Sequence, residues 1–106
     1  MAYVYLIKSG NNYKIGYTSN LGFRFAQYIT CNPNAQMVQY VRVQKKTKHQ
    51  LETIIHNEIE DMGYKFLTVR NPFTKKTVVT EWIKSDTEIS LSMFKATKNR
   101  KIVNID

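Results

Sequence analysis

Apolar and polar residues alternate at the start of the chain in a pattern typical of β-strands. Residues 2–7 read Ala-Tyr-Val-Tyr-Leu-Ile, and residues 13–18 read Tyr-Lys-Ile-Gly-Tyr-Thr. Both segments are rich in the β-branched and aromatic residues that strands favour. Residues 9–12 lie between them and read Ser-Gly-Asn-Asn, which tolerates the positive φ angles of a tight turn. The pattern therefore predicts an N-terminal β-hairpin.

Two helices and a third strand are predicted next. Asn20 or the serine before it can cap a helix of about ten residues, which ends where a proline follows Asn32. Residues 36–44 alternate again and predict a strand. The clearest helical periodicity follows, with apolar residues at steps of three and four: Leu51, Ile54, Ile55, Ile59 and Met62. We expect this second helix to end at Gly63.

The C-terminal part of the chain predicts two more strands and a last helix. Residues 64–69 and 77–83 are strand-like, and the Asn-Pro pair between them supplies a turn, which indicates a hairpin or an extended loop. Residues 85–88 read Ser-Asp-Thr-Glu, a capping box. We therefore expect a C-terminal helix that runs into the basic tail at 95–101. All these elements belong to a single domain over residues 1–106.

Composition places the chain among ordinary globular domains. Of its 106 residues, 42% are apolar and 23% are charged, which suits one domain and leaves no room for a second core. No apolar run approaches the roughly 20 residues of a membrane helix, and the start of the chain lacks the features of a signal peptide. Cys31 is the single cysteine, so an intrachain disulfide cannot form. We expect an intracellular protein, in the cytoplasm or nucleus of a host cell, that makes no contact with membranes.

Positive charge is concentrated in the first half of the chain. The net charge is +8, and residues 1–50 carry seven Lys and Arg residues and no acidic one, so that Glu52 is the first carboxylate. Such a charge distribution attracts polyanions and suits phosphate contacts. Charge alone leaves two kinds of partner open, a nucleic acid or an acidic protein.

Several motifs that carry chemistry are missing from the sequence. The four glycines are scattered singly, which excludes a glycine-rich phosphate loop, and no Cys/His spacing of a zinc finger is present. His49, Glu52 and His56 form the one His/Glu cluster, near one face of the predicted helix. They do not follow the HExxH order and have no evident further ligand. We interpret them as a polar helix flank with one functional carboxylate.

Short motifs in a fixed order carry more information than any one of them. They are Tyr3-Val4-Tyr5-x-Ile7, then Tyr13 to Thr18, then Leu21 and Arg24 with Gln27, then Thr30 with Asn32-Pro33, then Glu52 with His56, then Glu81-Trp82. This order resembles the GIY-YIG nuclease superfamily, and most closely its branch in phages and large DNA viruses. The resemblance covers residues 3–82 and leaves residues 83–106 outside as a C-terminal helical extension.

The resemblance implies both a fold and a reaction. The fold is of the mixed α/β class, more narrowly α+β. It has a small three-stranded antiparallel central sheet flanked by helices, an extra hairpin or loop, and the C-terminal helix. The reaction is hydrolysis of DNA phosphodiester bonds with one divalent ion, Mg²⁺ or Mn²⁺, per active site, which leaves 5′-phosphate and 3′-hydroxyl ends. Cutting both strands with one such site requires a homodimer, a second encounter or a partner protein.

Four residues match catalytic positions of that family. Tyr5 and Lys14 match the positions that activate the attacking water, and which of the two takes the proton is open. A phenol with a pKa of about 10 needs a nearby cation to favour the phenolate, and Lys14 is the candidate for that cation. Arg24 matches the residue that grips the scissile phosphate. Glu52 matches the metal-binding position, and a hard carboxylate suits Mg²⁺.

Five further residues take supporting or DNA-binding roles in this interpretation. Gly16 allows close approach of substrate or of a neighbouring strand. His56 is expected to orient the metal-binding carboxylate or a backbone group. Tyr13 and Tyr17 share a strand and are expected on alternate faces, so that only one reaches the cleft. Tyr28 replaces a histidine of the family and keeps a hydrogen bond to phosphate.

Basic residues outside the motifs are expected to contact the DNA backbone: Lys45, Lys46, Arg70, Lys75 and Lys76. The last three lie in segment 64–80, which is longer than the usual connection, and a solvated loop is the alternative interpretation for it. The sequence departs from the family at Tyr3 and Thr80, where glycine is usual. A nucleic-acid-binding module that no longer cuts is the alternative function, and a binder of acidic proteins is the third.

Overall fold

The computed structural model describes residues 1–105 and, within them, every side chain except that of Lys48. It contains two α-helices, six strands and two 3₁₀ turns. The strands are β1 (Ala2–Ser9), β2 (Asn12–Thr18), β3 (Gln36–Val43), β4 (Phe66–Arg70), β5 (Thr77–Lys84) and β6 (Ile102–Asn104). The helices are α1 (Leu21–Cys31) and α2 (Lys48–Asp61). The α+β class predicted from the sequence is confirmed.

The sheet has six strands rather than the three that we expected. Its order is β4-β5-β2-β1-β3-β6, and all neighbouring strands are antiparallel. The expected three strands form the centre, but both of their outer edges are extended. The β4–β5 hairpin pairs with β2, and β6 pairs with β3, because each open edge offers unpaired backbone groups that a further strand can satisfy.

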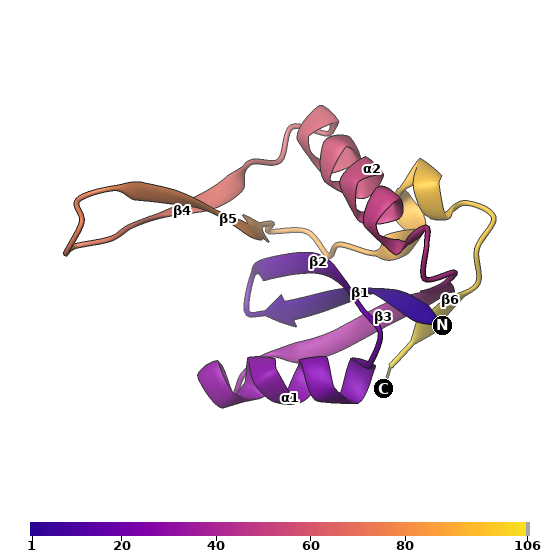
Figure 1. The fold of residues 1–106 in the computed structure, drawn as a ribbon. Helices are drawn as coiled ribbons and strands as arrows, with labels where there is room; N and C mark the ends of the chain where they lie inside the picture. Colours follow the sequence, from indigo (N-terminus) through magenta and orange to yellow (C-terminus); the bar gives the residue numbers. More distant parts are fainter. Residues whose placement is uncertain (106) are drawn as a thin grey trace.

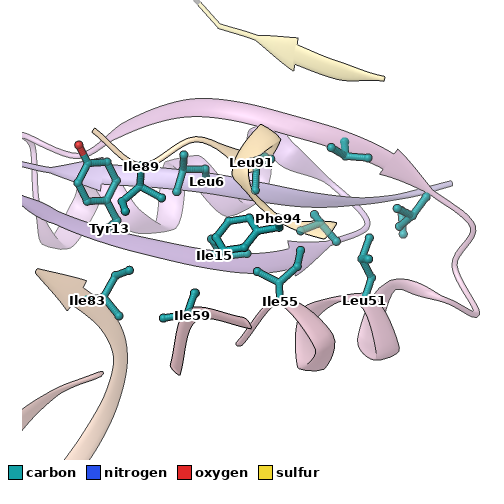
Figure 2. Packing of buried hydrophobic residues seen from close by; sticks show 14 residues of the cluster. Leu6, Tyr13, Ile15, Leu51, Ile55, Ile59, Ile83, Ile89, Leu91 and Phe94 are labelled. Atoms are coloured by element: carbon teal, nitrogen blue, oxygen red, sulfur yellow. The ribbon is translucent and has the colours of Figure 1, made fainter. Parts of the chain in front are cut away.

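The two faces of the sheet are covered by different helices (Figure 1). On one face, side chains from β1 and β2 pack against Leu51, Ile55 and Ile59 of α2, and Figure 2 shows this core. This core also includes Leu6 and Ile15. Ile54 and Met62, which the periodicity placed on the same stripe, are instead exposed. On the other face, a smaller cluster around Tyr5 and Ile7 packs against residues of α1. Strand alternation explains this division, because successive side chains of β1 point to opposite faces.

Local signals explain where α1 begins and where α2 ends. The Asn20 side chain accepts a hydrogen bond of 3.0 Å from the N–H of Phe23 and caps α1, as predicted. Helix α2 is followed by Gly63 with φ of +92°, a left-handed conformation that glycine adopts without steric cost.

The prediction of a C-terminal helix was wrong. Residues 91–97 instead form two 3₁₀ turns, Leu91–Met93 and Lys95–Thr97, before β6. The Ser85 hydroxyl donates a hydrogen bond of 2.7 Å to the carbonyl of Thr87 and closes a local turn, so it does not start a helix. Glu58 of α2 accepts hydrogen bonds from the N–H groups of Lys95 and Ala96, which docks this segment on α2. No helix in residues 1–105 is long and apolar enough to cross a membrane.

Candidate active site

A polar cleft of about 280 Å³ opens where β1, β2, α1, α2 and β5 meet. Its lining includes all four residues for which we expected catalytic roles. They are Tyr5 of β1, Lys14 of β2, Arg24 of α1 and Glu52 of α2. Gly16, Tyr17, His49 and Glu81 complete the wall. The fold therefore brings residues that are 47 positions apart in the sequence to one place.

Tyr5 forms the floor of the cleft by packing directly on Gly16. The two residues are register partners in β1 and β2, and the Tyr5 side chain is only 2% exposed. A Cβ atom at position 16 would lie 2.5 Å from the Tyr5 Oη atom and 2.7 Å from its Cζ atom. Glycine is thus required at this position because the phenol of the neighbouring strand occupies the space of a side chain.

The surroundings of Tyr5 keep its hydroxyl protonated. Burial raises the pKa of Tyr5, and the hydrogen bond of 2.8 Å that its hydroxyl shares with the Tyr28 hydroxyl raises it further. The charge of Arg24 lowers the pKa but does not offset these effects. The expectation that a nearby cation makes Tyr5 a phenolate is therefore not met in this structure.

Lys14 is held by other partners. Its Nζ atom lies 3.3 Å from Oε2 of Glu81 and 5.2 Å from the centre of the Tyr28 ring. Burial by itself lowers the pKa of Lys14, but the hydrogen bonds and charges of Tyr28 and Glu81 outweigh it, and the pKa is raised overall. Lys14 consequently stays positively charged and contributes a fixed cation to the cleft.

Two carboxylates share the cleft. Burial raises the pKa of Glu52, and the charge of Glu81 adds to this effect, whereas His56, His49 and Lys14 lower the pKa. The Glu52 carboxylate has no hydrogen-bond or ion-pair partner among the described residues. Within residues 1–105, no three His, Cys, Asp or Glu side chains lie close enough to hold one metal ion. One or two carboxylates without further protein ligands fit Mg²⁺, which keeps several waters and also binds substrate phosphate.

Arg24 joins the cleft to a second hollow of about 500 Å³. Lys14 and Arg24 line both spaces, and the second is also lined by Gln27, Tyr28, Cys31, Asn32 and Trp82. The Nε atom of Arg24 is shielded from solvent and has no hydrogen-bond partner among the described residues. Arg24 lines both spaces, and a guanidinium there can donate N–H groups to an anion such as phosphate.

Comparison with protein-family models identifies the family of this chain. Residues 2–100 match the T5orf172 domain. The chain belongs to the T5orf172 domain family. T5orf172 domains are phage-associated domains of the GIY-YIG/HNH-type endonuclease clade, and the family is associated with nuclease-like proteins. Neither the comparison with curated proteins nor that with solved structures gave a match.

Two histidines of this T5orf172 domain lie on the same helix but have different surroundings. The Nε2 atom of His56 lies 3.1 Å from the backbone oxygen of Ile15, so His56 holds a backbone group of β2. The Nδ1 atom of His49 lies 3.0 Å from the Tyr17 hydroxyl, and both residues line the cleft. Sequence reasoning did not single out His49 as a site residue. Its position one helical turn before Glu52 is the signal that places it there.

The two tyrosines of β2 divide as expected, but for a different reason. Tyr17 lines the cleft, whereas Tyr13 is buried in the core against α2. Residues four apart in a strand lie on the same face, so the expectation of alternate faces was wrong. Their positions along the strand separate them, because Tyr17 lies at the end of β2 beside His49.

The basic residues expected to contact DNA lie on two segments of this T5orf172 domain. Lys45 and Lys46 are exposed in the turn that precedes α2, near the helix end that carries His49. Arg70, Lys75 and Lys76 are exposed in the outer part of the β4–β5 hairpin. The predicted hairpin therefore exists, and its cations lie on an extension of the sheet.

Proposed function

We propose that this T5orf172 domain is a metal-dependent DNA endonuclease of the GIY-YIG type, which hydrolyses phosphodiester bonds to 5′-phosphate and 3′-hydroxyl ends. The observation that carries the proposal is the presence of the Arg24 guanidinium and the unpartnered Glu52 carboxylate in the lining of one cleft. A guanidinium that can donate hydrogen bonds to phosphate and a hard oxygen ligand for a divalent cation, both in one cleft, are what a phosphate and its metal ion require together. The net charge of +8 favours delivery of a polyanion to this cleft.

Arg24 and Lys14 bind the scissile phosphate in this proposal. The guanidinium grips the phosphate oxygens and stabilises the negative charge that grows on them in the transition state. Lys14 is fixed by its ion pair with Glu81 and adds a second positive charge beside the phosphate. Removal of one such donor typically reduces the rate by about 10²–10³-fold.

Tyr5 orients the attacking water. Its hydroxyl retains its proton, and the hydrogen bond to Tyr28 fixes its direction, so that it holds the water by a hydrogen bond. Attack of this water on phosphorus breaks the bond to the 3′ oxygen, and the proton that the water gives up passes through the solvent of the cleft to that oxygen. Gly16 leaves the phenol in place by adding no side chain. Mg²⁺ or Mn²⁺ bound through Glu52 would supply polarisation of the phosphate and stabilisation of the leaving oxygen.

Cleavage of supercoiled plasmid and of a branched oligonucleotide tests this function. The wild type and the Glu52→Gln and Arg24→Ala variants are assayed with Mg²⁺, with Mn²⁺ and with EDTA, and DNA binding is followed by fluorescence anisotropy. Glu60→Gln is the matched control, because it makes the same change on α2 outside the cleft. We expect cutting that requires the metal, disappears in Glu52→Gln with binding retained, and is unaffected in Glu60→Gln.

The alternative function, a module that binds nucleic acid without cutting it, makes the opposite prediction. In that case the wild type binds DNA with a steep salt dependence but cuts no substrate with either metal. A protein that binds DNA and cuts nothing would therefore overturn the nuclease proposal.

A further inference from the structure

The outer part of the β4–β5 hairpin, residues 67–80, forms an arm that projects from the body of the molecule (Figure 1). Only three residue pairs join β5 to β2, and these are Asn12–Lys84, Tyr13–Ile83 and Lys14–Trp82. Beyond them β4 and β5 pair with each other alone. The arm exposes several large apolar side chains to solvent: Val69, Phe73, Val78 and Val79.

Phe73 is the most exposed of these side chains. It is 93% exposed at the tip of the arm. The tip is nevertheless ordered, because the Asn71 side chain accepts hydrogen bonds from the N–H groups of Phe73 and Thr74. Lys75 has φ of +64° and donates its N–H to the carbonyl of Asn71. The backbone that carries Phe73 is already closed into a turn, so this backbone loses little conformational freedom when the ring binds a partner.

The charge of the arm indicates the chemistry of that partner. The arm carries three Lys and Arg residues and no acidic residue. Arg70, Lys75 and Lys76 flank the exposed phenylalanine at the tip. Lysine is depleted in interfaces between proteins, whereas lysine and arginine around an aromatic ring are typical of surfaces that bind nucleic acid. The arm therefore suits DNA better than a protein partner.

A series of hollows connects the arm to the cleft. The 280 Å³ cleft and the 500 Å³ hollow share Lys14 and Arg24. The 500 Å³ hollow in turn shares Asn32 and Trp82 with a hollow of about 240 Å³ at the base of the arm. Leu67, Val69 and Thr80 of the arm line that last hollow. One nucleic-acid strand can thus contact the cleft and the arm without leaving the surface.

We propose that the arm binds the same DNA as the cleft and that Phe73 stacks on a base that is unpaired or has lost its neighbour. Arg70, Lys75 and Lys76 bind the phosphates on either side of that base. This inference rests on the proposed function, since it names the form of DNA that the nuclease takes. An apolar ring inserted between bases must first separate them, and this costs least where a base is already unpaired. The substrate class is therefore DNA with unpaired nucleotides, such as a bulge or a branch.

The test measures binding in EDTA, so that it does not depend on cutting. The full chain is titrated against three labelled oligonucleotides, namely a perfect duplex, the same duplex with a three-nucleotide bulge, and a single strand. We expect tighter binding of the bulged duplex than of the perfect one. Phe73→Ala should weaken binding of the bulged duplex by about 5- to 150-fold, the range for one base stacked on an aromatic ring.

Three further variants make the test specific. Phe23→Ala is the matched control, because Phe23 is 64% exposed on α1, outside the arm, and its removal should change no affinity. Phe73→Trp should retain the preference for the bulge. The double variant Lys75→Gln and Lys76→Gln should weaken duplex binding. The plot of log binding constant against log salt concentration should become less steep by about 0.9 for each phosphate that the protein no longer neutralises.

Several outcomes would overturn the inference. One is a Phe73→Ala variant that binds all three oligonucleotides as the wild type does, or that loses affinity equally for all of them. Another is a wild-type dimer in sedimentation that becomes a monomer in Phe73→Ala with DNA binding unchanged, since the arm would then be a protein interface. A failure of this kind leaves metal-dependent cutting by the wild type intact, whereas a wild type that binds no DNA refutes both proposals.

Discussion

Replacement of Gly16 by alanine is a direct perturbation of the candidate active site. The added Cβ atom would lie 2.5 Å from the Tyr5 hydroxyl oxygen and 2.7 Å from the ring carbon that bears it. Ordinary contacts of such atoms begin near 3.4 Å. The Tyr5 ring must therefore move by close to 1 Å, or β1 and β2 must separate locally.

Neither movement is easy. Tyr5 is almost completely buried, and it packs with Ile7 and Met37 in the cluster between the sheet and α1. An extra methyl group in a packed core typically costs about 1–3 kcal/mol of unfolding free energy. For a chain of 106 residues this corresponds to a fall of about 4–12 °C in Tm. The same movement strains the hydrogen bond to Tyr28 and carries the hydroxyl out of the position proposed for orienting water.

Thermal unfolding followed by circular dichroism checks this prediction. Gly22→Ala is the control, because a Cβ at position 22 would meet its nearest atom at an ordinary 3.7 Å and position 22 lies in α1. That change should stabilise the protein by up to about 1 kcal/mol, since alanine is the better helix former. Gly16→Ala and Tyr5→Phe should be non-additive, because the phenylalanine removes the nearest clashing atom. A Gly16→Ala variant with wild-type Tm and activity would refute the reasoning.

Three further predictions concern charge and polar contacts. Because burial raises the pKa of Glu52, ionisation of this carboxyl reduces the stability of the protein as the pH rises through the ordinary glutamate range. The metal-free Glu52→Gln variant should therefore have a higher Tm than the wild type at pH 7. In a pH series of melting curves this difference should vanish below about pH 4. Gln39→Leu should cost about 1–3 kcal/mol in urea unfolding, because the buried N–H of Leu91 loses its acceptor at 2.7 Å. Glu58→Ala should speed amide hydrogen exchange at residues 95–96, whose N–H groups bond to its carboxylate, while exchange in β1 stays unchanged.

The parts of the fold that sequence could predict are those with local signals. Strands β1 and β2, both helices and the β4–β5 hairpin follow from periodicity, caps and turn residues. Strand β6 is too short to give such a signal, because it has three residues, which follow the basic tail and pair with β3, more than 60 positions away. The capping box at Ser85 misled us because the same hydroxyl can close a turn or cap a helix, and the neighbouring residues decide between them.

The sequence predicted four residues of the candidate site but neither His49 nor the electrostatics of the site. The order of motifs was sufficient to select Tyr5, Lys14, Arg24 and Glu52, which line one cleft. The pairing of Lys14 with Glu81 depends on how β5 aligns with β2, and no sequence pattern encodes that register. The protonated state of Tyr5 likewise follows from burial and from Tyr28, which only the packed structure reveals.

The narrow attachment of the β4–β5 arm has a consequence for protein engineering. Since three residue pairs fasten β5 to β2, residues 67–80 can be exchanged as a cassette without rebuilding the sheet or the cleft. Hairpins with other tips, grafted at the same junction, would give a series of proteins that share one cleft and differ in the surface of the arm. Natural variation in length and sequence should accordingly accumulate in this segment before it reaches the strands beneath it.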